Sequence, residues 1–137
     1  MPVEQPVLSP PGGGETVRSA LGSTTELKTE ASQCGGDYGV VVYTVKAGDE
    51  PPMHSHSRED ELVYVIAGDL VAHVGGASVD VGPGAFAALP RGVPHTISVK
   101  GDEATLLLTF SPGGLERFFV PVAGATADPA AFGLTFP

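Results

Sequence analysis

The sequence predicts an all-β domain, and two observations support this. The 137 residues include 19 glycines and 13 prolines, which break helices and favour tight turns. Between these turn signals lie short runs rich in β-branched and aromatic residues. Their spacing of roughly 8–12 residues is typical of β-sandwiches and barrels. A chain of this length is expected to form one domain around a single hydrophobic core.

The elements follow in order along the chain. Residues 1–14 are rich in proline and glycine and are expected to form a flexible N-terminal arm. The strongest predicted strands are Tyr38–Lys46 and Glu61–Ala67, which are dense in valine, isoleucine and tyrosine. The remaining predicted strands are shorter or less regular: Val17–Leu21, Glu26–Glu30, Leu70–Val74, Ser78–Val81, Ala85–Leu89, Thr96–Val99 and Ala104–Phe110.

Two of the predicted strands are apolar on both faces. Nearly every residue of Leu62–Ala67 and Leu106–Phe110 is apolar, whereas a strand with one face in water would alternate. One face can line a barrel interior. The other face can pack either on a second sheet of the same chain or on a second subunit, and the strand pattern leaves these two alternatives open.

The pattern changes after the turn at residues 111–114. Leu115–Val120 is predicted to form a short helix, because its apolar residues lie three and four positions apart and share one face. This helix is expected to close one end of the β domain. Residues 121–137 form a C-terminal tail, and its two phenylalanines predict that the tail docks on the domain.

The composition excludes several classes of function. Seven Lys and Arg against 16 Asp and Glu give a net charge of −9, and the basic residues form no cluster, so nucleic-acid binding is not expected. No apolar run approaches the roughly 18 residues of a membrane span, so no membrane association is expected. The N-terminus lacks the features of a signal peptide, and Cys34 is the single cysteine. A reduced, cytoplasmic location is therefore expected.

Three of the four histidines lie in two short segments flanked by turns. His54 and His56 are two residues apart, so on a strand both imidazoles project from one face, and an acidic run follows at residues 59–61. His95 follows a turn rich in proline and glycine. Three imidazoles and one carboxylate can hold a divalent first-row metal ion and leave coordination positions open. The alternative for the His54–His56 pair alone is a surface strand with two polar residues.

The spacing of these residues resembles the two motifs of the cupin superfamily. The first motif (G, five residues, HxH, three or four residues, E, six residues, G) is matched by Gly48, His54, His56, Glu61 and Gly68. The second motif (G, five residues, PxG, two residues, H, three residues, N) is matched by Gly84, Pro90, Gly92 and His95. Val99 stands where the second motif usually has Asn. This departure concerns a turn-stabilising contact and does not touch the ligands.

The resemblance implies a double-stranded β-helix, the jelly-roll barrel of cupins, over residues 15–120 with its closing helix. It also implies one divalent transition metal ion (Fe, Ni, Mn, Co or Zn). Glu61 is preferred to Glu59 because it has the right distance to Gly68. Family habit and the two-faced apolar strands together favour a homodimer. The implied metal ligands are His54, His56, Glu61 and His95.

Strand parity extends the site into a substrate pocket. If Glu61 points inward, Val63 and Val65 do so too, and the intervening residues point outward. Packing in the core is the alternative for Tyr43 and for the phenylalanines. The predicted pocket residues are Tyr43, Val63, Val65, Phe86, Ile97, Phe110 and Phe118.

Three further polar residues lie outside the implied ligand set. His73 is expected to be an exposed strand histidine outside the metal site. Arg58 and Arg91 flank the ligand turns, where they either steer an anionic substrate or are solvated loop residues.

Over roughly residues 7–120 the chain looks similar to single-domain actinobacterial cupins grouped with quercetin 2,3-dioxygenase-like proteins. The segments that carry this likeness are LSPPGGGETV, HSHSREDELVYVIAG and LLLTFSPGGLERFF. It implies a metal-dependent dioxygenase for an aromatic or enolic, flavonol-like small molecule, with Glu61 as general base. Two alternatives stay open. One is a non-redox isomerase, lyase or polyketide cyclase that uses zinc, and the other is a non-catalytic cupin that binds a metal or small ligand.

Overall fold

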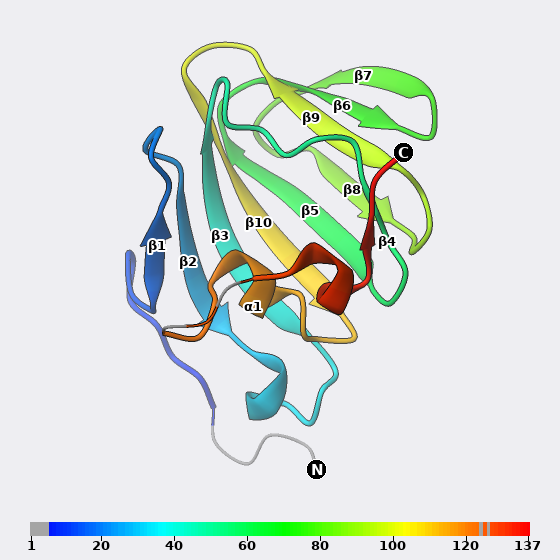
Figure 1. The fold of residues 1–137 in the computed structure, drawn as a ribbon. Coiled ribbons are helices and arrows are strands. Elements are labelled where there is room, and N and C mark those ends of the chain that lie inside the picture. The colour runs from blue at the N-terminus through cyan, green and yellow to red at the C-terminus, as the bar shows by residue number, and fades with distance from the viewer. Residues whose placement is uncertain (1–5, 124, 126) are drawn as a thin grey trace.

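The structure, a computed structural model, describes residues 6–123, 125 and 127–137, so the first five residues of the predicted arm lie outside the described residues. Its strands form a barrel with short connections, and one short helix packs at one end (Figure 1). The predicted all-β double-stranded β-helix is confirmed. Within the described residues no helix is both long and apolar enough to cross a membrane.

All strand pairs in the barrel are antiparallel. The largest sheet has the order β1 (Thr16–Arg18), β2 (Thr24–Thr29), β3 (Gly39–Lys46), β10 (Glu103–Ser111), β5 (Asp60–Ala67), β8 (Phe86–Leu89). The second sheet has the order β7 (Ala77–Val81), β6 (Leu70–Val74), β9 (His95–Val99). A two-stranded sheet pairs β11 (Leu134–Thr135) with β4 (Ser55–His56).

Every predicted strand is present, with ends displaced by at most a few residues. The largest displacement is in β1, which ends at Arg18 because Ser19 begins a turn in which Gly22 adopts a positive φ. The sequence prediction did not include β4 and β11. Each has only two residues, which is too short for a pattern of alternation to be visible.

The core lies between the two larger sheets and follows strand parity. On β10, Ala104, Leu106, Leu108 and Phe110 are buried, and the residues between them are less buried or exposed. On β5 the predicted parity is confirmed, because Glu61 and Val65 are buried whereas Leu62, Tyr64 and Ile66 are 36%, 45% and 47% exposed. The outer face of this sheet therefore lacks a covering layer within the described chain.

The helix α1 (Glu116–Phe119) is confirmed at the predicted place, and it carries a buried carboxylate. Glu116 is 1% exposed, and its two oxygens accept hydrogen bonds from the backbone N–H groups of Ala31 (2.8 Å) and Gly114 (2.7 Å). Gly39 at the start of β3 leaves room for it, since a Cβ there would overlap the carboxylate. Glu116 thus joins the helix, the 3₁₀ helix Ala31–Gln33 and β3.

Replacing Glu116 with Ala is expected to lower the free energy of unfolding by about 2–4 kcal/mol, because two buried N–H groups lose their acceptor and a cavity remains. Denaturant titration followed by circular dichroism measures this change. Glu103→Ala is the matched control, since Glu103 pairs with Lys46 at an exposed strand end and its loss should cost little. Equal stability of the two variants would contradict the role given to Glu116.

Candidate metal centre

The two histidine segments meet in a backbone bridge. The N–H of His54 donates to the carbonyl of His95 (3.1 Å), and the N–H of His95 donates to the carbonyl of His54 (2.8 Å). The N–H of Gly92 donates to the carbonyl of His56 (2.7 Å), so the turn before His95 also holds β4. Directly opposed residues in an antiparallel pair present their side chains on the same face. The bridge therefore brings imidazoles from two distant segments to one place.

The three imidazoles form a buried cluster. The ring centroids lie 5.0 Å apart for His54 and His56, 4.4 Å for His54 and His95, and 4.9 Å for His56 and His95. One nitrogen of each ring lies within 4.8 Å of the others, and the side chains are 8%, 2% and 7% exposed in chain order. Three imidazoles this close and this deep are a donor set suited to a first-row transition metal.

Hydrogen bonds orient two of the rings for ligation. Nδ1 of His54 donates to the carbonyl of Pro52 (2.7 Å), and Nδ1 of His95 donates to the carbonyl of Val93 (3.1 Å). This leaves Nε2 of both rings with a free lone pair. Nε2 of His56 and Nε2 of His95 are buried with no hydrogen-bond partner among the described residues. Such unpaired buried nitrogens are costly in a folded protein, and a cation would satisfy them.

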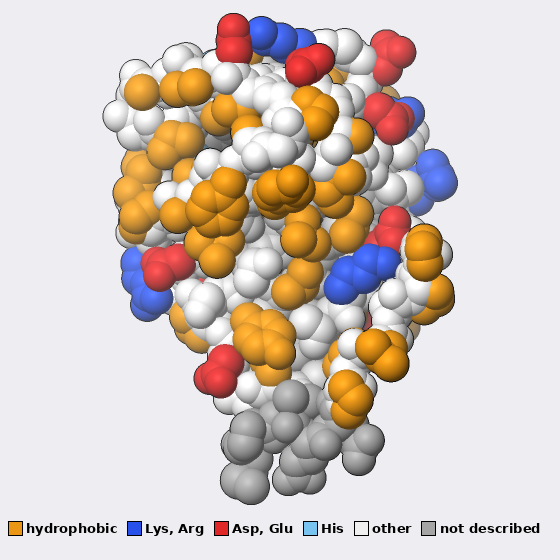
Figure 2. Space-filling model, turned by 180° about the vertical axis from the view of Figure 1, so that it is seen from behind, with side chains coloured by type: hydrophobic (Ala, Val, Ile, Leu, Met, Phe, Trp, Pro, Cys, Tyr) orange, Lys and Arg blue, Asp and Glu red, His pale blue; other side chains and the backbone are white. Residues whose placement is uncertain are grey.

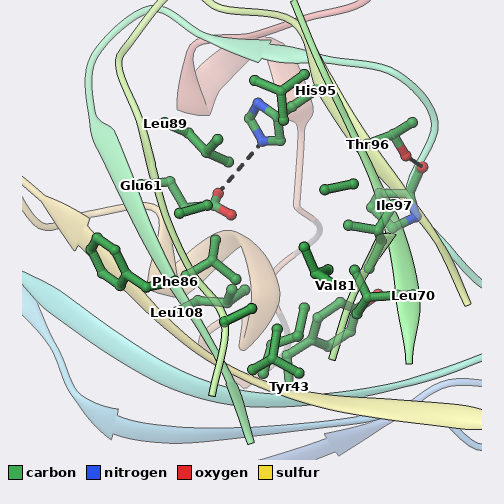
Figure 3. Close-up of a pocket in the computed structure, with 18 of the residues that line it drawn as sticks. Tyr43, Glu61, Leu70, Val81, Phe86, Leu89, His95, Thr96, Ile97 and Leu108 are labelled. Atoms are coloured by element: carbon green, nitrogen blue, oxygen red, sulfur yellow. Dashed lines mark hydrogen bonds and ion pairs between the residues drawn. The ribbon is translucent and has the colours of Figure 1, made fainter. Parts of the chain in front are cut away.

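Glu61 lies against this cluster from β5. Its Oε1 is 3.6 Å from Nε2 of His56 and 3.8 Å from Nε2 of His95, and the second of these pairs is drawn in Figure 3. With metal–ligand bonds of about 2.0–2.2 Å, neighbouring ligand atoms of one ion lie about 3.0–3.5 Å apart, so these separations need only a small contraction. Glu59, the alternative carboxylate, is also buried but makes no such pair with an imidazole of the described chain.

The electrostatics of the three imidazoles differ. Burial lowers the pKa of His54, and burial lowers the pKa of His56 to about 4. Burial acts in the same direction on His95, but the nearby carboxylate of Glu61, together with the Val93 carbonyl, raises the pKa of His95 above the usual value. Of the three imidazoles, His95 is therefore the one that most readily accepts a proton.

The loop before His54 is held by a residue that the sequence analysis did not single out. The Glu50 carboxylate accepts hydrogen bonds from the N–H groups of Gly48 (2.7 Å) and Val99 (2.9 Å). The hydroxyl of Thr96 donates to the carbonyl of Pro51 (2.6 Å). These bonds fasten the loop to β9. Val99, at the position where the motif usually has Asn, takes part through its backbone.

The C-terminal tail also contacts β4, the strand that carries His56. In the β11–β4 pair, Leu134 lies opposite His56, and the Phe136 ring is 6.5 Å from the His54 ring. Before β11, a 3₁₀ helix (Pro129–Phe132) receives a hydrogen bond from Arg58 to the carbonyl of Ala131 (2.8 Å). The tail therefore covers the outer side of the histidine cluster.

A cavity leads inward from the cluster. It measures about 720 Å³ including its opening to solvent, and its walls are mostly aliphatic (Figure 3). Of the predicted pocket residues, Tyr43, Val63, Val65 and Ile97 line it. Phe86 borders it, but its side chain is 63% exposed and pairs in register with Tyr64 on the outer face.

Two predicted pocket residues lie elsewhere. Phe110 is fully buried behind the cavity wall, between the rings of His56 and Phe119, and Phe118 packs edge-on against Phe132. Phe119, which is not among the seven predicted pocket residues, lines the cavity. Phe118 and Phe119 point in different directions because neighbouring side chains on a helix are about 100° apart. The sequence marked all three phenylalanines as apolar and carried no signal for which of them faces the cavity.

The remaining polar candidates lie outside the cluster. His73 lies between the hydroxyls of Ser78 (2.8 Å) and Ser98 (2.9 Å), on the face of β6 opposite the cavity-lining residues. The backbone N–H and the side chain of Arg91 both donate to Asp60 (3.0 and 3.1 Å), which lowers the pKa of that carboxyl. Both arginines that flank the ligand turns are thus engaged in contacts within the chain.

Comparisons with known proteins agree with this geometry. The cupin domain family matches residues 41–111, which include both histidine segments. An RmlC-like cupin from Shewanella frigidimarina is 22% identical with a TM-score of 0.66, over 77% of this chain and 90% of that one. The polyketide cyclase RemF from Streptomyces resistomycificus is 22% identical with a TM-score of 0.57, over 65% and 64% of the two chains.

Oxalate decarboxylase from Bacillus subtilis, a protein with Mn(II) centres, is 27% identical with a TM-score of 0.62, over 73% of this chain and 28% of that one. No curated protein sequence matched the chain. The family match spans more than half of the sequence and includes every residue of the three-histidine cluster. The chain therefore belongs to the cupin domain family.

Proposed function

We propose that this cupin is a metal-dependent dioxygenase that acts on an uncharged aromatic or enolic small molecule of flavonol-like shape. The observation that carries the proposal is an apolar cavity that ends at three buried imidazoles and one carboxylate. One divalent ion (Fe, Ni, Mn, Co or Zn) would be held by His54, His56, His95 and Glu61, and dioxygenation requires one of the redox-active ions among these. The manganese protein at 27% identity supports this choice of metals.

A bound redox-active ion supplies Lewis acidity towards an enol oxygen and the electron transfer that reaction with dioxygen requires. The residues of the chain supply the remaining functions. The imidazoles offer neutral nitrogen donors, since burial keeps the pKa of His54 and His56 low. Glu61 accepts the proton of the substrate enol at its carboxylate, so it acts as general base. Both oxygen atoms of dioxygen enter the product, and the aliphatic walls exclude water.

Away from the metal end, the cavity offers no cationic group. Among the described residues that line it there is no lysine or arginine, and the chain has a net charge of −9. A charged group of a substrate that does not reach the metal would therefore lack a partner for its charge. This favours a substrate whose only ionisable group is the enol or phenol that meets the metal.

The same cavity supports one non-redox alternative. A zinc ion can polarise a carbonyl there without oxygen, and the fold likeness to a polyketide cyclase favours an isomerase, lyase or cyclase over other second candidates. A cupin that binds a metal or small ligand without turnover is the third candidate. Oxygen consumption separates the first candidate from the other two.

We further propose that two copies of the chain pair through the outer face of the largest sheet. Leu62, Tyr64 and Ile66 on β5 lie next to Phe86 on β8, and all four are exposed. Figure 2 shows hydrophobic side chains gathered on the back of the molecule, with charged groups towards its margins. An uncharged face suits a second copy, because two chains of net charge −9 repel elsewhere, and interface cores are depleted in charge.

Alanine at His54, His56 or His95 is expected to reduce metal content from about one ion per chain to a small fraction of that, because each change removes one ligand. Elemental analysis of protein purified without added metal measures it, and circular dichroism checks the fold. The matched control is His73→Ala, which removes a histidine that bonds only to serines and should keep full occupancy. Undiminished metal in the three cluster variants would contradict the assignment.

Oxygen uptake tests the reaction itself. Protein loaded separately with Fe, Ni, Co, Mn or Zn is expected to consume oxygen with a flavonol or catechol for at least one redox-active ion and not for zinc. Glu61→Gln should slow turnover by about 10²–10⁴-fold by removing the general base. Turnover of the same substrates without oxygen would favour the non-redox alternative, and no uptake with any well-loaded ion would reject the dioxygenase.

Tyr64→Glu is expected to convert a dimer into a monomer, because it places charge in the centre of the apolar outer face. Light scattering coupled to gel filtration measures the mass. The control is Val79→Glu on β7, which is 56% exposed but belongs to the other sheet, so it should leave the dimer intact. A monomeric parent protein would reject the pairing.

A further inference from the structure

The cavity has a second polar group, the hydroxyl of Tyr43. Tyr43 projects from β3 into the cavity, and its hydroxyl makes no hydrogen bond to any described residue. The other neutral hydroxyl on the cavity wall, that of Thr96, donates to the carbonyl of Pro51. Outside the metal cluster, Tyr43 thus carries the free polar side chain among the described residues that line this cavity. A hydroxyl in such apolar surroundings is expected to bind something that the cavity receives.

Strand register places the backbone of Tyr43 several residues along the sheet from that of Glu61. Tyr43 lies opposite Leu106 on β10, and Leu106 lies opposite Val65 on β5. Val65 is four residues beyond Glu61 on the same strand, which corresponds to about 13 Å at about 3.3 Å per residue. In Figure 3, Tyr43 lies at one end of the cavity, and Glu61 and His95 lie at the other.

The wall between these two ends is apolar. Leu70, Val81, Ile97 and Leu108 occupy it, and Figure 3 shows them around the space that has Tyr43 at one end and Glu61 and His95 at the other. The cavity therefore has hydrogen-bonding or metal-binding groups at both ends and hydrocarbon between them. Such a distribution selects for an elongated molecule with a polar atom at each end and a nonpolar middle.

The aromatic ring of Tyr43 is held in place. Its edge packs on Phe119 with ring centroids 5.6 Å apart and an interplanar angle of 65°, and Phe119 stacks on the buried Phe110 (5.6 Å, 18°). Burial raises the pKa of the Tyr43 phenol, and the charges of Asp49, Glu50 and Glu61 add to this effect. The phenol therefore stays protonated at neutral pH and can donate a hydrogen bond from a fixed position.

We propose that the Tyr43 hydroxyl binds an oxygen at the end of the substrate remote from the metal, so that the substrate is an elongated, uncharged molecule with a hydrogen-bonding oxygen at each end. Tyr43 is then a specificity residue, and the inference rests on the proposed function only in taking the metal cluster as the other end. A substrate without the distal oxygen would cover the phenol with hydrocarbon and leave it unpaired, which costs affinity.

Two probes that differ by one hydroxyl test this. Flavonol and its analogue with a para hydroxyl on the pendant ring are titrated without oxygen against zinc-loaded protein, with dissociation constants measured by fluorescence. The parent protein is expected to bind the hydroxylated probe about 5–10-fold more tightly, as one neutral hydrogen bond allows. Tyr43→Phe should abolish this preference and leave the affinity for plain flavonol equal or higher. Tyr38→Phe, which removes the hydroxyl of an exposed tyrosine that does not line the cavity, should keep the preference.

The same preference in the parent protein and in Tyr43→Phe would overturn the role of Tyr43, and binding of neither probe would overturn the assigned shape and polarity of the substrate. Repeating the titration after metal removal separates this inference from the proposed function. A preference that depends on Tyr43 in a protein that consumes no oxygen would reject the dioxygenase and support the specificity role. Oxygen uptake by a protein that shows no preference for the hydroxylated probe would support the dioxygenase and reject the specificity role of Tyr43.

Discussion

The site depends on the reciprocal backbone pairing of His54 and His95. Two hydrogen bonds join a loop to the start of β9, and both imidazoles leave the bridge on the same side. Glu50 holds the same loop against β9 further along. Because the contacts are made by the backbone and by one carboxylate outside the cavity, the histidine side chains remain free to bind a ligand.

The buried ionisable side chains fall into two groups that differ in whether their polar atoms are hydrogen-bonded. Glu116 is buried with both oxygens bonded to backbone N–H groups, so its charge is fully satisfied and serves to connect segments. Glu61, His56 and His95 are buried with close but unbonded donor and acceptor atoms. Unsatisfied polar atoms are costly in a protein interior, and they cluster where a ligand completes their bonding. This contrast distinguishes the structural carboxylate from the functional one.

The apolar residues of the strands form two separate surfaces, according to the face of the strand on which they lie. Inward residues of β5 and β10 form the core and the cavity, and outward residues of β5 form an exposed uncharged face. A strand with apolar residues on both faces thus contributes to two surfaces, one inside the barrel and one outside it. The inner surface excludes water from the metal end of the cavity, and the outer surface is available for a second copy of the chain.

Much of this protein was determined by the sequence itself, because the signals are local. Two-residue periodicity predicts the strands and the side to which Glu61, Val63 and Val65 point, and glycine and proline mark the turns between them. The HxH spacing places His54 and His56 on one face, and the resemblance to cupin motifs adds Glu61 and His95. The strands and the HxH pair need only the geometry of a strand, whereas Glu61 and His95 as ligands are what the resemblance implies.

Only the tertiary structure decided which distant segments meet. The pairing of β11 with β4, the hydrogen bonds of Glu50 to β9, and the choice of Phe119 over Phe110 and Phe118 at the cavity all depend on contacts between residues far apart in the chain. Very short strands carry no readable period, and an apolar helix face does not say what it packs against. Long-range packing therefore decided which residues surround the cavity. Local periodicity decided on which side of each strand the candidate metal ligands lie.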